Sequence, residues 1–436
     1  MPKKENILEL GEIIYLYLRT LAKWLFLSVI IGAVCGAAGS VFHHGVHYAS
    51  ELRAGHPWLL YLLPAAGIII AAIYKVTKTE GKGTNQVLDV VQRGDGLPFL
   101  LLPAIFAGTT LTHLCGGSAG REGAALQMGG TIGYHAGRIC RLDTQDLKIA
   151  TMAGMSAFFS ALFGTPLAAA VFSIMVESIG AMYHAALLPC LTSALTAYGI
   201  SLLMGVEPTR FTVAMPSLNA VLLLRVALLA ALCALVSVLF CEVIHQTEHQ
   251  MARRLKNSYV RAAVGGVAII LLTLLSGTTA YNGAGMDVIT AAVEQGSANA
   301  SAFLLKLIFT AVTLGAGFKG GEVVPSFFVG ATFGCVVGPL LGIDAGFAAA
   351  IGLISVFCGA TNCPIASTFL AIELFGDGGL LYFAAACIIT YVLSGYSGLY
   401  SSQTFSSSKL KARPLDAHAN DHHIEHIEHT ESSKTP

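Results

Sequence analysis

The chain has 436 residues, and its 25 Lys and Arg with 25 Asp and Glu amount to 11% of them, against roughly 25% in an ordinary soluble domain. Apolar side chains make up 55%, 47 residues are glycine, and the formal net charge is zero. So few charges cannot cover a soluble surface. The composition excludes a water-soluble globule, a disordered chain and a nucleic-acid binder, and it predicts an all-α polytopic membrane protein.

Residues 1–20 are charged and amphipathic, unlike a cleaved secretory signal, and they predict a cytoplasmic helix that lies at the membrane interface. Apolar segments follow at residues 21–42, 57–74, 98–115, 149–177, 183–205, 219–244, 259–276, 302–316, 323–341, 344–359, 363–375 and 379–396. Several are shorter than the roughly 20 residues of a straight span, and glycine and proline interrupt them. We therefore expect broken helices around a protein-lined cavity, because lipid cannot satisfy the end groups of a helix.

Clusters of basic residues predict the orientation of the chain. They are Lys3/Lys4 with Arg19/Lys23, Arg138/Arg141/Lys148, Arg253/Arg254/Lys256/Arg261 and Lys409/Lys411/Arg413. By the positive-inside rule these clusters and both termini face the cytoplasm. Residues 403–436 are expected to form a cytoplasmic tail. Its histidines, His418, His422, His423, His426 and His429, indicate either a solvated disordered tail or a weak transition-metal site.

Two stretches of the chain repeat each other. Residues 154–177 align without a gap on residues 352–375, 198 positions later. The alignment superposes Gly154/Gly352, Pro166/Pro364, Ala168/Ala366 and Ile174/Ile372. We expect two repeats, residues 21–205 and 219–402, joined by a loop at 206–218. Such repeats place a transporter's site at their interface, where helix N-termini attract anions.

Glu122 is the strongest candidate for chemistry. With Arg121 it belongs to GREGA, residues 120–124, inside the otherwise uncharged stretch 97–137. A carboxylate at that depth is costly unless it lines water or an ion path. Just before a helix expected over residues 124–137, it would compete with an anion for the same amides, and protonation would release it. The alternative is that Glu122 only caps the helix or pairs with Arg121.

The second repeat carries a comparable loop. Glycines at 317, 320 and 321 precede Glu322, Val323, Val324 and Pro325, and proline in the first turn is typical of a helix start. Glycine lets the backbone approach an ion, so the amides of Glu322 and Val323 are candidate anion donors. Two readings of the Glu322 side chain stay open: a gate or proton carrier, and a charge that faces solvent or caps locally.

The membrane portion, residues 21–402, resembles the CLC family of chloride channels and anion/proton antiporters. The matching motifs are GREG at 120–123, FGTPLAAAVF at 163–172, GGEVVP at 320–325 and GLYSSQ at 398–403. The resemblance implies a fold of two inverted-topology repeats with broken, tilted helices, and a homodimer with one anion pathway per subunit. It implies Glu122 as the external gating glutamate and Tyr400 as the central tyrosine that meets the anion. The residues expected around the anion are Gly120, Arg121, Gly123, Gly320, Gly321, Glu322 and Val323. An interfacial aromatic before the basic tail is the alternative for Tyr400.

Departures from the chloride pattern point to one subclass. GKGTNQ at 81–86 lacks the family's coordinating serine, so Thr84 and Asn85 are the candidate replacements, with Lys82 near that place. Val323 replaces an aromatic residue and Ala124 a proline. The inner proton-transfer glutamate of chloride exchangers falls on Val176, and on a helix Glu177 would point about 100° away. These features resemble the bacterial fluoride-exporting subclass.

The expected function is therefore fluoride/proton antiport that exports fluoride across a prokaryotic plasma membrane, without a cofactor or metal. The alternative within the family is a chloride channel or chloride/proton exchanger. A membrane sensor that binds an anion without turnover is the alternative from another class. An enzyme is not expected, because the membrane part has no nucleophile beside a base and no metal-ligand cluster. The ten cysteines lie singly, without CxxC spacing, and are interpreted as core residues.

Overall fold

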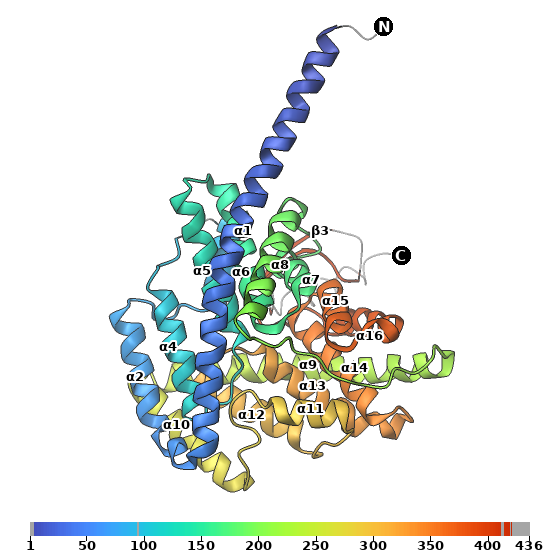
Figure 1. Cartoon of the computed structure of the whole chain (residues 1–436). Coiled ribbons are helices and arrows are strands. Elements are labelled where there is room, and N and C mark those ends of the chain that lie inside the picture. Colours follow the sequence, from blue (N-terminus) through green and yellow to red (C-terminus); the bar gives the residue numbers. More distant parts are fainter. Residues whose placement is uncertain (1–3, 94–95, 411–413, 419, 421–436) are drawn as a thin grey trace, which may run out of the picture.

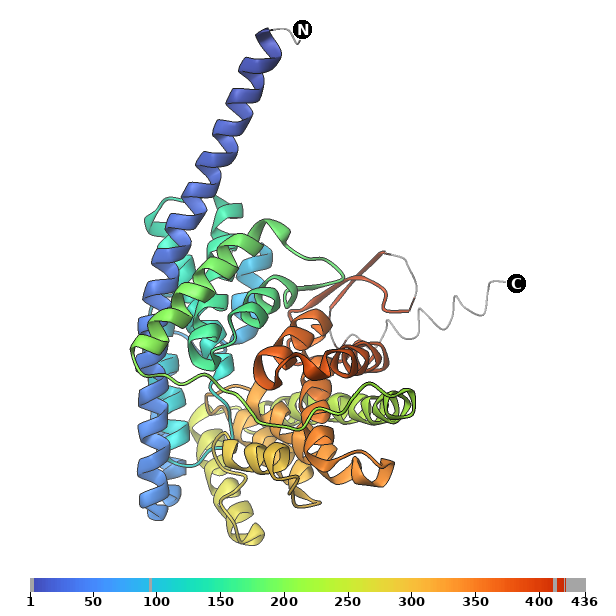
Figure 2. The same cartoon turned by 45° about the vertical axis from the view of Figure 1, so that its right-hand side comes forward.

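The computed structural model describes residues 4–93, 96–410, 414–418 and 420. Most of the described part is helical (Figures 1 and 2). The helices are α1 (Lys4–Gly55), α2 (Leu63–Val76), α3 (Thr84–Arg93), α4 (Leu101–Leu114), α5 (Glu122–Ile139), α6 (Thr144–Phe163), α7 (Pro166–Met175), α8 (Leu187–Leu203), α9 (Ala220–Arg254), α10 (Ser258–Ser276), α11 (Met286–Glu294), α12 (Ala302–Gly315), α13 (Val323–Val337), α14 (Ala345–Thr361), α15 (Pro364–Phe375) and α16 (Leu380–Leu393). The strands are β1 (Ser178–Ile179), β2 (Thr404–Ser407) and β3 (Pro414–His418).

The lengths of the helices fit a membrane protein with broken spans. In the described part of the chain, five helices are long and apolar enough to cross a membrane, judged by length and composition. Further apolar helices, among them α4, α7, α13 and α15, have only 10–17 residues. The predicted all-α fold with interrupted helices is therefore confirmed.

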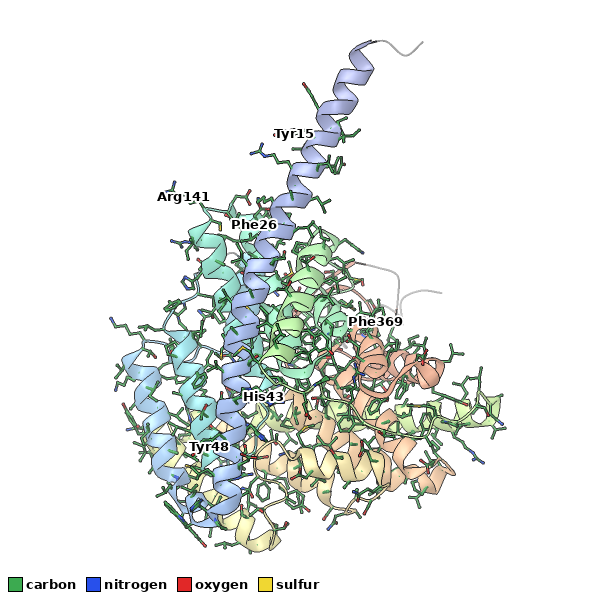
Figure 3. The ribbon with its side chains drawn as sticks, in the orientation of Figure 1. Tyr15, Phe26, His43, Tyr48, Arg141 and Phe369 are labelled. Atoms are coloured by element: carbon green, nitrogen blue, oxygen red, sulfur yellow. The ribbon has the colours of Figure 1, made fainter. Side chains whose placement is uncertain are left out.

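The N-terminal segment differs from the prediction. α1 is one helix of 52 residues, and its first part projects away from the other helices (Figure 1). No glycine or proline occurs between Gly11 and Gly32, so nothing ends a helix near residue 20. Residues 4–20 are thus continuous with the first span and do not form a separate interfacial helix. Tyr15 and Phe26 stand out from α1 (Figure 3) and are 67% and 71% exposed.

Glycines bring two pairs of helices into backbone contact. A Cβ atom on Gly129 of α5 would lie 2.2 Å from the carbonyl oxygen of Gly154 on α6. In the second half, a Cβ on Gly330 of α13 would lie 2.2 Å from the carbonyl oxygen of Gly352 on α14. The same close crossing therefore occurs in both halves, at the aligned residues Gly154 and Gly352.

The ends of α6 and α14 also correspond. Asp143 accepts from an amide in the first turn of α6, and Asp344 does the same for α14. Gly164 and Asn362, both in the left-handed conformation, end these helices. A helix that begins with proline follows each of them. The two halves are thus built as repeats, with the same caps in the same order.

A small sheet corrects the prediction for the C-terminal tail. β2 pairs in parallel with β1 and in antiparallel with β3. Phe405 of β2 is fully buried, and its ring centroid lies 4.8 Å from that of Tyr396. Residues 404–407 and 414–418 therefore form paired strands and not a disordered chain. The proposed metal ligands His422, His423, His426 and His429 lie outside the described residues.

The cysteines are free, as predicted. Cys140 is exposed and the others are buried. The buried cysteines are therefore core residues, as predicted, and only Cys140 among the ten is not.

Candidate functional site

The two repeats touch at the loops before α5 and α13. Gly120 and Gly321 exchange two backbone hydrogen bonds, each with an N···O distance of 2.8 Å. A Cβ on Gly321 would lie 2.4 Å from the backbone nitrogen of Gly123, and one on Gly320 would lie 2.3 Å from the Cβ of Ala119. Only glycine permits this approach. The contact brings the N-termini of α5 and α13 together in the protein interior, where both helices have free N–H groups.

The side chain of Glu122 lies between these two helix ends. Glu122 is fully buried and is itself the first residue of α5, two positions earlier than the predicted start. Its Oε2 accepts a hydrogen bond of 3.4 Å from the backbone N–H of Val324, in the first turn of α13. A Cβ on Gly120 would lie 2.1 Å from this oxygen, so the side chain folds back over Gly120. The carboxylate occupies a place suited to an anion.

The other oxygen of Glu122 is unsatisfied. Oε1 is buried and has no hydrogen-bond partner among the described residues. Arg121 is the nearest opposite charge, with its Nε 4.0 Å from Oε1, which is too long for a hydrogen bond. If Glu122 only capped α5 or paired with Arg121, its buried Oε1 would still lack a hydrogen-bond partner among the described residues.

The second loop supplies a further carboxylate. Glu322 stands at the N-cap position of α13 and is half-buried, and Val323 after it is fully buried. The charged groups within electrostatic range of Glu322 include Glu122, Glu248 and Lys319. Glu322 thus lies within electrostatic range of Glu122, and both readings of its side chain stay open.

Tyr400 lies inside the protein. It is 1% exposed, and its hydroxyl is buried without a hydrogen-bond partner among the described residues. Glu122 and Glu322 are both within electrostatic range of this hydroxyl. The interior position excludes the alternative of an interfacial aromatic. A free O–H donor near two helix N-termini is suited to an anion.

The start of α3 joins these parts. The hydroxyl of Thr84 lies 3.5 Å from the carbonyl oxygen of Gly123 and accepts from Gln127 at 3.1 Å. Asn85 Oδ1 accepts from the backbone N–H of Ser402 at 3.2 Å, two residues after Tyr400. Of the two candidates for the missing serine, Thr84 is therefore on the Glu122 side and Asn85 on the Tyr400 side.

Comparison with known proteins gives the family. Residues 65–395 match the voltage gated chloride channel family. The chain belongs to this CLC family. A chloride/fluoride channel protein of Pseudomonas syringae pv. tomato is 35% identical over 404 residues, which cover 91% of this chain and 89% of that protein. The H(+)/Cl(-) exchange transporter ClcA of Vibrio cholerae is 25% identical over 434 residues, covering 90% and 92%. The crystal structure of a CLC-type fluoride/proton antiporter superposes with a TM-score of 0.86 at 34% identity, covering 88% and 98%.

In this CLC protein, the structure corrects the prediction that Val176 and Glu177 lie on one helix. α7 ends at Met175, so Val176 and Glu177 lie beyond the helix and the expected 100° separation does not apply. Val176 is fully buried and Glu177 is 4% exposed. The backbone oxygen of Glu177 accepts from Gln92 at 3.4 Å and from the N–H of Thr404 at 3.1 Å. Its Oε2 is buried without a partner among the described residues.

Glu177 is a buried titratable group whose enclosure the sequence did not predict. It lies outside the spanning helices, and burial raises its pKa to about 7, although the positive charge of Lys148 acts in the opposite direction. The family motif aligns the inner glutamate with Val176. Because α7 ends at Met175, the next residue, Glu177, leaves the helix and is buried.

The raised pKa predicts how pH affects stability. Between the unfolded value of 4.5 and about 7, the folded protein holds a proton on Glu177 that the unfolded chain releases, so stability falls as pH rises through this window. Glu177→Gln should therefore melt about 2 °C above wild type at pH 8 and close to it at pH 5, measured by thermal unfolding in mild detergent. The exposed Glu207→Gln is the control. The same difference at both pH values would contradict the assignment.

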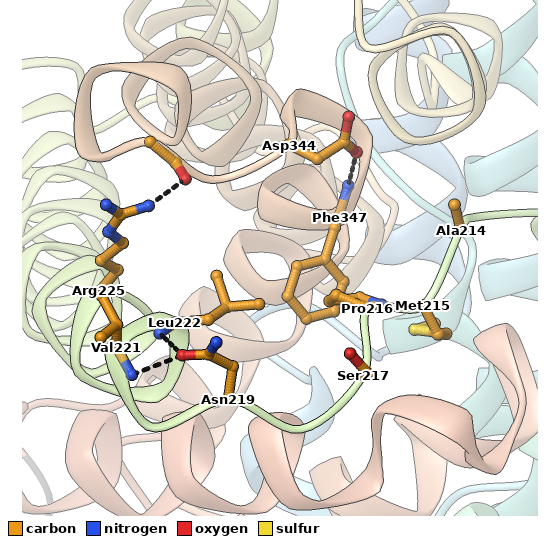
Figure 4. A pocket seen from close by; sticks show the side chains of 11 residues that line it. Ala214, Met215, Pro216, Ser217, Asn219, Val221, Leu222, Arg225, Asp344 and Phe347 are labelled. Carbon is orange, nitrogen blue, oxygen red and sulfur yellow. Dashed lines mark hydrogen bonds between the residues drawn. The ribbon is translucent and has the colours of Figure 1, made fainter.

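A separate cavity lies away from these residues. It has a volume of about 580 Å³ and opens between residues 214–219, the start of α9 and the turn before α14 (Figure 4). On its walls Arg225 donates to the carbonyl oxygen of Gly342 at 2.8 Å, and Asp344 accepts from the N–H of Phe347 at 3.0 Å. None of the predicted site residues lines it. The candidate site is instead packed between the repeats.

Proposed function

We propose that this CLC protein is a fluoride/proton antiporter that exports fluoride. The observation that carries the proposal is the Glu122 carboxylate, buried between the N-termini of α5 and α13 and bonded to the amide of Val324. A carboxylate in an anion's place must leave before an anion can enter, and protonation weakens its hold on amide donors. Occupation by fluoride and protonation of Glu122 are then linked, so fluoride moves outward as a proton moves inward.

The residues around Glu122 have distinct roles in this proposal. The loops at 120–123 and 320–323, in which Gly120, Arg121, Gly123, Gly320, Gly321, Glu322 and Val323 lie, receive the anion. The N–H groups of Gly120 and Gly321 bond to each other's carbonyl oxygens, so the donors are the remaining backbone N–H groups of these loops. The Tyr400 hydroxyl is a further donor, and Thr84 and Asn85 contribute from α3. A small anion holds its water tightly, so only close, strong donors replace its hydration shell. Buried amides and hydroxyls of this kind suit fluoride.

The proton must leave Glu122 without the inner glutamate that chloride exchangers of the family use. Val176 has no titratable group, and the family's inner glutamate is absent at that position. Glu322, within electrostatic range of both Glu122 and Glu248, supports a route in which the proton leaves Glu122 through Glu322 or water.

The choice of fluoride rests on Val323, on the missing serine near Thr84, and on relatives that are described with fluoride at 34% and 35% identity. Purified protein in liposomes should release fluoride at least about tenfold faster than chloride, a difference of about 1.4 kcal/mol. Ion-selective electrodes measure both rates. Equal or faster chloride release would favour the alternative, a chloride channel or chloride/proton exchanger.

We also propose a homodimer in a prokaryotic plasma membrane, with both termini in the cytoplasm. α15 and α16 have only 12 and 14 residues, fewer than a bilayer span requires, yet Leu381 and Ile388 of α16 are each 59% exposed. Short helices with exposed apolar side chains suit a protein partner better than lipid alone. Cross-linking in mild detergent should give a dimer, and monomers that transport at the full rate would contradict it.

A further inference from the structure

A histidine on α1 contacts the charged pair at the gate candidate. His43 Nδ1 lies 3.0 Å from Nη1 of Arg121, and Nε of the same guanidinium lies 4.0 Å from Oε1 of Glu122. His43 is on the part of α1 that runs alongside the other helices (Figure 3). Three side chains, from α1 and the start of α5, are therefore in series and end at the carboxylate.

The chemistry of this contact fixes the state of His43. A guanidinium has only donors, so Nδ1 must accept the hydrogen bond. The ring is therefore neutral with its proton on Nε2, since a protonated ring has no acceptor and would repel Arg121. The other charged or titratable groups that act on the ring are His44 and His47 of α1. His44 bonds to the carbonyl oxygen of Met204 at 2.9 Å and His47 pairs with Glu51 at 3.2 Å.

The position of Arg121 depends on this bond. Its side chain is 19% exposed, and the bond to His43 is the one hydrogen bond of its guanidinium within the described residues. At 4.0 Å from Oε1, the guanidinium attracts the carboxylate but does not bond to it. Without an acceptor on α1, Arg121 would be free to move onto Oε1, which has no other partner, and form a charge-assisted hydrogen bond. Such a bond would hold Glu122 ionised and in place.

We propose that His43 is a positioning residue that keeps Arg121 from bonding to Glu122, so that the carboxylate stays free to take up a proton. His43 touches neither fluoride nor the proton itself and acts through Arg121. The inference rests on the proposed function, because it concerns the exchange that Glu122 carries out.

Three substitutions at His43 test the role of the acceptor. Proton uptake driven by a fluoride gradient is measured in liposomes over a range of external pH. His43→Leu removes the acceptor and should lower the rate about tenfold at external pH 7, with the half-maximal rate moved to a lower external pH, because an ionised, bonded Glu122 is harder to protonate. His43→Phe, which keeps a ring without an acceptor, should do the same. His43→Asn places an oxygen near the position of Nδ1 and should restore most of the rate.

A second pair of variants separates positioning from a structural effect. In an Arg121→Met background, His43→Leu should cause no further loss of rate, since the two residues act in one pathway. His47→Leu, on the exposed part of the same helix, should match wild type.

Three outcomes overturn the inference: full activity of both His43→Leu and His43→Phe, failure of His43→Asn to restore the rate, or additive losses with Arg121→Met. Wild-type protein is measured first. Its failure to couple fluoride to protons would overturn the proposed function and this inference together, whereas normal coupling with any of the three outcomes overturns the inference alone.

Discussion

Glu122→Gln should abolish proton uptake driven by a fluoride gradient, with a loss of about 100-fold or more. The amide has nearly the shape of the protonated acid but neither binds nor releases a proton at neutral pH. Glu122 lies where the N-termini of α5 and α13 meet and accepts from the N–H of Val324, so its own carboxylate carries the proton in the proposed exchange. The measurement is pH change inside liposomes loaded with fluoride, beside electrode recordings of fluoride release.

Glu373 offers a matched control for this substitution. Its two carboxylate oxygens accept from the backbone N–H groups of Leu167 and Ala168, at 2.9 and 2.8 Å, at the start of α7. It is thus also a carboxylate at a helix N-terminus, but away from the contact between Gly120 and Gly321. Glu373→Gln should keep proton coupling. Full coupling in Glu122→Gln would remove the proposed mechanism, while membership of the CLC family would stand.

Passive fluoride flux in Glu122→Gln answers a separate question. A neutral side chain still in the anion's place would block the path, whereas one that has moved out would leave it open. Fluoride release without proton movement would identify the carboxylate as both gate and proton carrier. Loss of both fluxes would mean that the amide stays bonded to Val324.

Two features could be predicted from the sequence alone: the candidate carboxylate Glu122 and the internal repeat. A charge inside an apolar stretch is rare enough to mark Glu122, and glycines that recur with proline at one spacing mark the repeats. Two of these aligned glycines, Gly154 and Gly352, lie at the close helix crossings with Gly129 and Gly330. Both features depend on residues that are close in the sequence or that recur along it, so they can be recognised without knowledge of the fold.

The sequence could not predict features that depend on contacts between distant segments. Thr84 and Asn85 are adjacent, yet only the fold directs them to Gly123 and Ser402. The bond between His43 and Arg121 joins residues 78 positions apart, and a histidine in an apolar helix gives no indication of its partner. The sheet formed by β1 and β2 joins segments more than 200 residues apart, which strand propensity alone does not reveal.

Gly321→Ala should disrupt both folding and transport. The added Cβ would lie 2.4 Å from the backbone nitrogen of Gly123 and 2.9 Å from that of Glu122. Because these neighbours are backbone atoms, a change of rotamer cannot relieve the clash. Separating the loops would weaken the two 2.8 Å hydrogen bonds to Gly120, each worth about 1 kcal/mol, and overpacking adds a similar or larger cost. The free energy of unfolding should fall by about 3 kcal/mol, and fluoride release should fall more than about tenfold.

Gly199 of α8 provides the control for this loss. No atom lies within 4 Å of a Cβ added there, and the residue is exposed within a helix, so Gly199→Ala should be neutral or stabilise the protein by up to about 1 kcal/mol. Thermal unfolding in detergent and fluoride release from liposomes give both quantities. Wild-type values for Gly321→Ala would mean that the repeats tolerate separation at this point. The amides of α5 and α13 would then not need to meet for an anion to be held, and the site would have to be built on Tyr400 and one repeat alone.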